Sequence, residues 1–182
     1  MIVKLTVMLV SFFMLFPGHI LGLPARDVQL ITDREYFNIV QTCFREARSS
    51  IGVMMFEAAY YERYLNSPTN LLIRELIAAR RRGVEVKVIL EKRKEGDRTQ
   101  KNNMKTGRML SEAGVQVAYD PVAVTTHTKL LIIDGEISIV GSTNWTYSAL
   151  EKNHEVSVLI RSPEVAKDLQ DYFQSMWKTC VN

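Results

Sequence analysis

Short, continuous apolar runs alternate with amphipathic stretches along the first two thirds of the chain, and this alternation limits the possible folds more than any other feature. The apolar run at 51–56 has no polar face, which is typical of a strand buried on both sides of a sheet. The stretch that begins at Ser67-Pro68 spaces its apolar residues as a helix does and stops at Gly83. Asp33 is placed to cap an earlier helix. By these patterns we predict strands at 28–32, 51–56, 84–90 and 115–119, and helices at 33–49, 67–82 and 101–113.

The C-terminal third has a different pattern. Asp134-Gly135 lies between two apolar runs, 125–133 and 136–140, and this dipeptide favours a hairpin turn. A further strand is predicted at 153–160, and Ser162-Pro163 opens a last helix. Helices that alternate with buried strands predict an α/β fold, with a mixed, mostly parallel sheet flanked by helices on both faces.

The composition agrees with one globular domain. The 182 residues are 47% hydrophobic and 24% charged, which excludes a disordered chain and a collagen-like chain. Two cysteines, Cys43 and Cys180, are too few for a disulfide framework or for a zinc site of four cysteines. Whether they pair with each other is left open at this point.

The N-terminus has the pattern of a targeting segment. Lys4 precedes an apolar run over 5–16, and Pro17-Gly18 ends any helix there. The length of this run and the small residues that follow it are typical of a secretory signal peptide, which we place at residues 1–25. An uncleaved membrane anchor is the alternative. We therefore predict one domain over 26–182, in a protein that is exported, periplasmic or secreted, or anchored at a membrane by its N-terminal segment.

Basic residues concentrate between Arg80 and Arg108. This stretch holds eleven basic and four acidic residues, a net charge of +7, whereas the whole chain has +3. Such a local charge favours a polyanionic partner, either nucleic acid or an anionic lipid surface. The alternative is a solvated helix face followed by a charged loop. Within this stretch, Lys92, Arg93 and Lys94 are the predicted substrate-binding residues.

Polar residues that are suited to catalysis lie on the predicted hairpin. His127 and Lys129 are two positions apart on a strand, so their side chains share a face. Ser142 and Asn144 follow the second strand of the hairpin, and the ammonium, hydroxyl and amide groups of these residues are donors that suit phosphate oxygens. Glu155 lies on the next strand, where its carboxylate could hold the second nitrogen of the histidine ring.

The spacing of these residues is specific. It reads H-x-K-x4-D-x6-G-S-x-N, and a chain of this length would match it by chance with a probability on the order of 10⁻⁶. The pattern resembles the signature of the phospholipase D superfamily, and the resemblance extends over residues 28–180. The nearest likeness is to the small bacterial endonucleases of that superfamily that carry one motif. The residues that match the signature are His127, Lys129, Asp134, Gly141, Ser142 and Asn144.

The resemblance implies a mixed sheet flanked by helices and a phosphodiesterase that needs neither a metal nor another cofactor. It implies that His127 attacks phosphorus to give a phosphohistidine, which water then hydrolyses. In this scheme Lys129 and Asn144 hold the phosphate oxygens, Ser142 assists, and Glu155 orients the histidine. The catalytic set carried over from the family is His127, Lys129, Asp134, Ser142, Asn144 and Glu155. The place of Asp134 in an Asp-Gly turn favours a structural role for that member.

The chain has one copy of the motif, although displacement at phosphorus needs an acid for the leaving oxygen as well as a nucleophile. The other histidines are His19, in the leader, and His154, which strand alternation turns away from Glu155. We therefore predict a homodimer in which His127 of both copies shares one site.

Three functions remain open on the sequence. The first is a metal-independent phosphodiesterase that acts as a non-specific endonuclease on DNA or RNA, with nucleic acid as its partner. The second is a phospholipase D-type hydrolase of anionic phospholipids, favoured by the hydrophobic N-terminus, with a membrane as partner if that segment is not cleaved. The third is a protein without catalytic activity that binds nucleic acid or membranes. The intact set of polar residues on the hairpin argues against the third.

Overall fold

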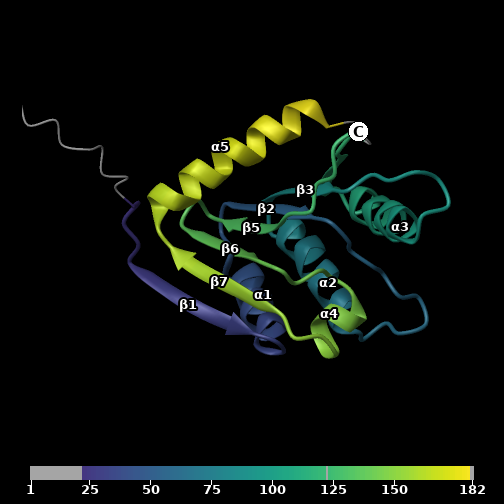
Figure 1. Ribbon diagram of the computed structural model, residues 1–182, viewed down its shortest axis with the longest axis horizontal. Coiled ribbons are helices and arrows are strands. Elements are labelled where there is room, and N and C mark those ends of the chain that lie inside the picture. The colour runs from purple at the N-terminus through teal and green to yellow at the C-terminus, as the bar shows by residue number, and fades with distance from the viewer. Residues whose placement is uncertain (1–21, 122, 181–182) are drawn as a thin grey trace, which may run out of the picture.

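A seven-stranded sheet crosses the part of the chain that the computed structural model describes, which is residues 22–121 and 123–180 (Figure 1). The strands are β1 (Asp27–Thr32), β2 (Ser50–Met55), β3 (Glu85–Leu90), β4 (Gln116–Tyr119), β5 (Lys129–Ile133), β6 (Ile137–Gly141) and β7 (Val156–Arg161). Their order across the sheet is β1-β7-β6-β5-β2-β3-β4. The C-terminal hairpin, β5 and β6, therefore lies at the centre of the sheet, with β7 and β1 on one side and β2, β3 and β4 on the other.

The mixed α/β architecture is confirmed, but fewer strand pairs are parallel than predicted. Within the described ranges, β2 pairs with β3 and β3 with β4 in parallel, whereas the other four pairings are antiparallel. The reason is that β5 enters beside β2 in the opposite direction, and β6, β7 and β1 then continue antiparallel. When both faces of a sheet are covered, a parallel strand and an antiparallel strand are both short apolar runs. The sequence pattern alone therefore does not give the direction of a strand relative to its neighbour.

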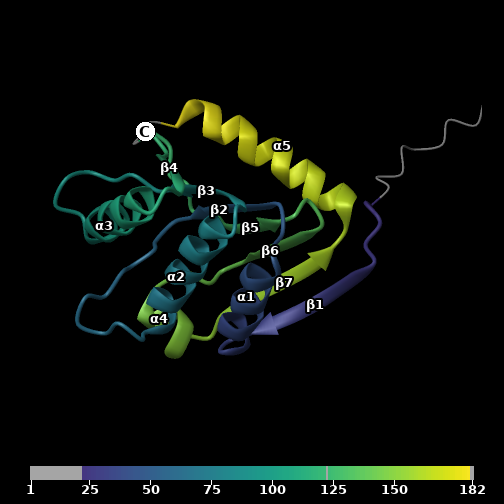
Figure 2. The ribbon, with the colours of Figure 1, turned by 180° about the vertical axis from the view of Figure 1, so that it is seen from behind.

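Helices cover both faces of the sheet (Figure 2). Helices α1, α2 and α3 lie on one face, and α5 crosses the other, where Phe173 is buried with Met54 and Ile132. Two helices begin as predicted, at Pro68 and Pro163. Ser67 caps the first by accepting a hydrogen bond from the N–H of Asn70, and Ser162 caps the second by accepting one from Val165. The helices are α1 (Glu35–Glu46), α2 (Pro68–Arg81), α3 (Arg98–Glu112), α4 (Tyr147–Glu151) and α5 (Pro163–Thr179).

The predicted cap at Asp33 is wrong. Asp33 has a positive φ of 49°, and the residue that caps α1 is Arg34, whose side chain makes no capping bond. The Asp33 carboxylate instead accepts the N–H of Glu155 at 2.8 Å. It therefore joins the end of β1 to the start of β7, a contact between residues far apart in sequence that no local pattern predicts.

The hairpin turn is confirmed. Asp134 and Gly135 both have positive φ, 54° and 66°, as a two-residue turn of type I′ requires. The strand before the turn is shorter than predicted, since β5 begins at Lys129 and residues 125–128 form a loop.

Some predictions fall on residues outside the described ranges. The signal peptide or anchor at residues 1–25 lies almost wholly there and stays a prediction. No helix within residues 22–121 and 123–180 is long and apolar enough to cross a membrane. Both thiols are free, and they lie on opposite faces of the sheet, Cys43 on α1 and Cys180 at the C-terminal end of α5. This placement is incompatible with a bridge between them within one chain.

We expect Asp134 to stabilise the fold. Its carboxylate accepts the N–H groups of Arg48, Ser49 and Ser50 at 2.8–2.9 Å. Although burial raises it, these bonds hold the pKa of Asp134 below its ordinary value. Asp134→Ala should lower the free energy of unfolding by about 2–4 kcal/mol, because it leaves several N–H groups without an acceptor. Denaturant unfolding at neutral pH measures this loss.

Two controls test that interpretation. Asp168→Ala, on the exposed side of α5, should change the free energy of unfolding by less than about 0.5 kcal/mol. A carboxyl group with a lowered folded pKa stabilises above its unfolded pKa, and this contribution is lost as the pH falls through the folded value. The difference between the wild type and Asp134→Asn should therefore shrink in acid, and a difference that does not change with pH would contradict the role of the charge.

Candidate active site

Four strand ends meet at one edge of the sheet, and they carry the polar residues of the hairpin (Figure 1). Met55, at the end of β2, pairs with Lys129 at the start of β5. Val140, near the end of β6, pairs with Leu130 on one side and Val158 on the other. Because the neighbouring strands run in opposite directions here, the end of β6 and the starts of β5 and β7 lie side by side. The residues predicted to converge are therefore at the same edge.

His127 and Lys129 are in contact. The Nζ atom of Lys129 lies 3.3 Å from Nδ1 of His127 and donates to the His127 carbonyl oxygen at 2.7 Å. Phe56, just after β2, packs on both side chains: its ring centroid is 4.6 Å from that of the imidazole and 5.0 Å from the ammonium nitrogen. The N–H of Phe56 also donates to the carbonyl oxygen of Thr128 at 3.1 Å. The shared face predicted for the two residues is thus present, although His127 precedes the strand.

The surroundings of this pair favour an unprotonated imidazole. Burial lowers the pKa of His127, and the positive charge of Lys129 lowers it further. Burial also lowers the pKa of Lys129, which is 6% exposed, while the negative charge of Glu155 acts in the opposite direction. The ring nitrogen lone pair is therefore available near neutral pH, beside an ammonium group that can stabilise negative charge.

Ser142 and Glu155 form a second contact at this edge. The hydroxyl of Ser142 donates to Oε2 of Glu155, and Asn153 donates to Oε1 at 2.9 Å. We expected Glu155 to hold the ring of His127; in the structure its carboxylate holds Ser142 instead. Gly141 permits this arrangement, because a Cβ there would lie 2.5 Å from the Cα of Ser157 on β7. The close backbone approach predicted at this glycine is thus an approach of β6 to β7.

Asn144 follows Ser142 at the end of β6. Its Oδ1 atom is buried and has no hydrogen-bond partner among the described residues. A buried polar group without a partner costs free energy, so this oxygen is an unfavourable feature of the folded chain. Trp145, the next residue, belongs to the core: it is 1% exposed and packs edge-on against Phe44.

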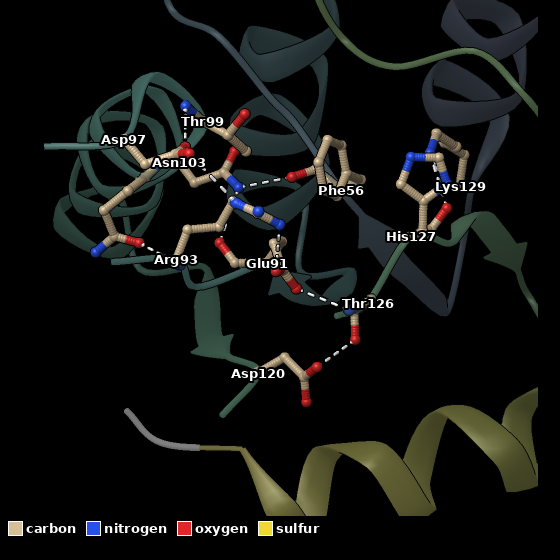
Figure 3. Close-up of polar contacts among 11 residues, drawn as sticks. Phe56, Glu91, Arg93, Asp97, Thr99, Asn103, Asp120, Thr126, His127 and Lys129 are labelled. Carbon is tan, nitrogen blue, oxygen red and sulfur yellow. Dashed lines mark hydrogen bonds and ion pairs between the residues drawn. The ribbon is translucent and has the colours of Figure 1, made fainter. Parts of the chain in front are cut away.

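Thr126, directly before His127, is held by two buried carboxylates (Figure 3). Its N–H donates to Glu91 at 2.8 Å, and its hydroxyl donates to Asp120. Both acids are 2% exposed. Burial raises the pKa of Glu91, and the bond from Thr126 and the charge of Arg93 counteract this effect. Residues 125–128, which we call the histidine loop, are therefore held in place by Glu91 and Asp120. The sequence patterns did not indicate this role for the two acids.

A detectable signal for these acids exists in the sequence. Glu91 directly follows the apolar run of β3, and Asp120 directly follows that of β4. Because β3 and β4 are parallel neighbours, their carboxyl ends lie at one edge, and acids at such positions are candidates for a shared contact. Asn103 on α3 completes the support, since its Nδ2 donates to the carbonyl oxygens of Phe56 and Glu91 at 2.8 and 2.9 Å (Figure 3).

Two sets of predicted site residues lie apart from the contact between His127 and Lys129. Asp134 is at the far end of β5, roughly 16 Å along the strand from Lys129, where it serves the turn. Its inclusion in the catalytic set is therefore wrong, and its structural interpretation fits. Lys92, Arg93 and Lys94 are in the loop between β3 and α3, next to the histidine loop. No group of three or more metal-binding side chains gathers anywhere in residues 22–121 and 123–180.

The arrangement combines a nucleophile with donors for an anion. His127 presents an imidazole whose pKa is lowered by burial and by the charge of Lys129, and the Lys129 ammonium lies 3.3 Å from Nδ1 of that ring. Such a pair suits attack on a centre whose oxygens gain negative charge in the transition state, since a preorganised cation stabilises that charge.

The comparisons with known proteins agree with this chemistry. A family model described as "Cardiolipin synthase, PLD-like domain" matches residues 40–177. The mitochondrial cardiolipin hydrolase of Mus musculus is 30% identical over 132 residues, which cover 72% of this chain and 53% of the relative. This chain thus spans about half the length of the curated relatives it matches.

Two solved structures share the fold. Nuc from Salmonella typhimurium, described as a phospholipase D family member, superposes with a TM-score of 0.71 at 25% identity, over 85% of this chain and 95% of that one. NucT from Helicobacter pylori superposes with a TM-score of 0.69 at 21% identity, over 86% and 98% of the two chains.

The contact between His127 and Lys129 predicts a change in titration. Lys129→Met removes the positive charge beside the imidazole and keeps a side chain of similar length. The pKa of His127 should rise toward its ordinary value, because the ammonium lowers it in the wild type. An NMR titration of the imidazole C–H protons measures the change. Lys178→Met, on the exposed last turn of α5, is the matched control, and an unchanged His127 titration in Lys129→Met would contradict the electrostatic contact.

Proposed function

Because this chain belongs to the family of phospholipase D-like domains, we propose that it is a phosphodiesterase that hydrolyses nucleic acid with His127 as its nucleophile. The observation that carries the proposal is the contact of the His127 ring with the Lys129 ammonium at 3.3 Å, at an edge that also holds Ser142. A buried lysine beside a histidine is a costly arrangement unless both address an anion. A phosphodiester is an anion that both groups fit.

The reaction proceeds in two displacements. A ring nitrogen of His127 attacks phosphorus, the P–N bond forms, and the P–O bond to the leaving oxygen breaks. Water then attacks the phosphohistidine, the P–N bond breaks, and the histidine is regenerated. In both steps Lys129 and the amide of Asn144 stabilise the charge on the non-bridging oxygens. Ser142, held by Glu155, is placed to assist them.

The proposal gives the electrostatic role to a side chain rather than to a divalent ion. The Lys129 ammonium is fixed by the carbonyl oxygen of His127 at 2.7 Å and by the face of Phe56. A positive charge held in a mostly buried position needs little reorganisation during the reaction, which is the condition under which such a charge stabilises a transition state most.

The leaving oxygen needs a proton, and this requirement supports the proposal of a homodimer. Among residues 22–121 and 123–180 the other histidine is His154, whose side chain is 97% exposed and lies 3.3 Å from Asp33 rather than beside His127. A second copy of His127, brought across a two-fold axis, would supply the acid.

An open sheet face beside the site also supports a dimer. Helix α5 covers the middle of its face and leaves β7 and β1 uncovered (Figure 1). The strand register places Leu30, Val158 and Val140 in one row across this face. Val28 and Leu30 are 60% and 62% exposed. Apolar groups gathered in this way are typical of an association surface.

The choice of nucleic acid rests on the basic loop of Lys92, Arg93 and Lys94, which lies next to the loop of His127. Phospholipid is the second candidate, and the 30% identity to a mitochondrial cardiolipin hydrolase favours it. Both substrates are phosphodiesters, so the same site chemistry serves either, and direct assay separates them.

We expect hydrolysis of single-stranded and double-stranded DNA and of RNA by the purified protein in the presence of EDTA. His127→Ala should lower the rate by about a thousandfold or more. Because the pKa of His127 is lowered, the acid limb of the pH–rate profile should lie below about pH 6.5. His154→Ala is the matched control and should retain the wild-type rate.

Four results would contradict this assignment. Loss of the activity with EDTA would refute the metal-independent mechanism, and an active His127→Ala protein would refute the nucleophile. Hydrolysis of cardiolipin vesicles without hydrolysis of nucleic acid would identify phospholipid, the second candidate, as the substrate. A folded protein that binds but cleaves neither would indicate a binding function alone.

The dimer predicts a variant that loses assembly and activity together. Val28→Glu with Leu30→Glu puts two charges on the open face, far from the reacting groups, and should yield a monomer by light scattering with little hydrolysis. Leu65→Glu, in an exposed loop at 56% exposure, is the control and should leave both unchanged. Circular dichroism confirms that each variant is folded, and a fully active wild-type monomer would overturn the shared site.

A further inference from the structure

We propose that Arg93 holds a second phosphate of the substrate, so that the site favours a nucleic-acid strand over an isolated phosphodiester. This inference rests on the proposed function and deepens it, because it names what lies beside the scissile phosphate. It concerns one member of the basic loop, and its support is geometric.

Arg93 is held in place rather than free in solvent. Its Nη1 lies 3.4 Å from Glu91 and its Nε lies 3.4 Å from Asp97. Its backbone N–H donates to Gln100 at 2.8 Å. A guanidinium has five N–H donors in a rigid plane, and the contacts with these two acids are made through Nη1 and Nε. The side chain is 36% exposed, so the remaining donors are accessible to a ligand.

The two acids that orient Arg93 already have other partners. Glu91 accepts the N–H of Thr126, and Asp97 caps α3 through the N–H groups of Thr99 and Gln100. These N–H groups therefore use part of the hydrogen-bonding capacity of both carboxylates. Each carboxylate lies 3.4 Å from the guanidinium, which is long for an ion pair. Arg93 keeps capacity for an additional anion.

Arg93 also lies near the proposed nucleophile. Its guanidinium carbon is 5.8 Å from the centroid of the Phe56 ring, and the imidazole of His127 is 4.6 Å from the same centroid (Figure 3). The two groups are thus at most about 10 Å apart, the sum of those distances. A nucleic-acid strand advances about 3.4 Å along its axis per phosphate. A strand cut at His127 would therefore place a phosphate one to three nucleotides away within reach of Arg93.

A cavity is present where that phosphate would lie. It has a volume of about 270 Å³ and opens between the loop of Arg93 and Thr125, two residues before His127. Lys92 and Lys94 line it as well. Neither lysine makes an ion pair with an acidic side chain in the part of the chain that the structure describes. The cavity is therefore lined by three cations, one of them fixed, together with the two acids that fix it, Glu91 and Asp97.

The test uses substrates that contain one hydrolysable diester. Thymidine 3′-(p-nitrophenyl phosphate) releases p-nitrophenol on cleavage and has a single phosphate. The same compound with a 5′-phosphate adds a second phosphate one nucleoside away, and the isomers with 5′ ester and 3′-phosphate reverse the polarity. Longer versions with neutral methylphosphonate linkages place the added phosphate two or three nucleotides away. Each pair is hydrolysed by the wild type, Arg93→Met and Arg98→Met.

We expect the added phosphate to lower KM of the wild type by about ten- to a hundredfold at one of these positions, as a charge-assisted contact would. Arg93→Met should lose this gain, so that the two esters of a pair are hydrolysed with nearly equal KM. Arg98→Met removes the same charge from a side chain that is 85% exposed and outside the cavity, and should keep the gain. Arg93→Lys should give an intermediate result, because lysine lacks the planar fork.

Binding gives an independent readout. In an inactive His127→Ala background, adding Arg93→Met should reduce the slope of log Kd for single-stranded DNA against log salt by about 0.7, the value for one lost phosphate contact. Arg98→Met should leave more of that slope in place.

The outcomes separate this inference from the proposed function. If Arg93→Met slows both esters of a pair equally, Arg93 has only a structural role and the inference is overturned. An added phosphate that gives no gain at any position, or a gain that survives Arg93→Met, overturns it too. Hydrolysis of cardiolipin vesicles but of no nucleotide ester would assign the second phosphate to a lipid. A protein that cleaves none of these substrates contradicts the proposed function itself.

Discussion

The antiparallel register of β5 between β2 and β6 determines where every group of the site lies. It sets Lys129 opposite Met55 and Leu130 opposite Val140. Successive side chains on a strand point to opposite faces, so a slip of one residue would move Lys129 to the side that α5 covers. The apolar residues of β5 are buried on both faces, and the turn at Asp134-Gly135 fixes the hairpin from the far end. The hydrophobic core therefore specifies the position of the ammonium beside the imidazole.

This arrangement has an energetic cost that the rest of the fold must offset. Lys129, Glu91 and Asp120 are at most 6% exposed, and Asn144 has a buried oxygen without a partner. Each would be less costly as an apolar residue, since burying charge and unpaired polar groups is unfavourable. Their accumulation at one edge of the sheet is the opposite of what stability alone requires. Such a concentration is typical of sites that are preorganised for a ligand.

Local patterns predicted the parts of the fold that depend on neighbours in sequence. Helices begin at Pro68 and Pro163 as expected, and the Asp-Gly turn has both positive φ values. Predictions failed where partners are distant: Asp33 bonds to Glu155 instead of capping a helix, and the direction of β5 beside β2 has no local signature. The spacing of the hairpin motif located the edge of the site, because period-2 alternation carries over from sequence to structure.

The supporting residues were missed for the same physical reason. Glu91 and Asp120 both meet Thr126, but Glu91 is 35 positions away from it, so only the parallel pairing of β3 and β4 brings the acids together. Glu155 was predicted in part. Its place beside the site follows from the strand pattern, whereas its hydrogen bond with Ser142 rather than His127 depends on side-chain geometry that the sequence does not give.

The positive charges at the site explain why we propose a polyanion as its ligand. Lys129 already lowers the pKa of His127, and a second copy of the site across a two-fold axis would add further positive charge nearby. Like charges at short range are unfavourable in a partly buried place, and a bound phosphate compensates them. A strand that also presents a phosphate to Arg93 compensates a third cation within about 10 Å. The repulsion between these cations would thus become binding free energy for a substrate with several negative charges, and less so for a substrate with one.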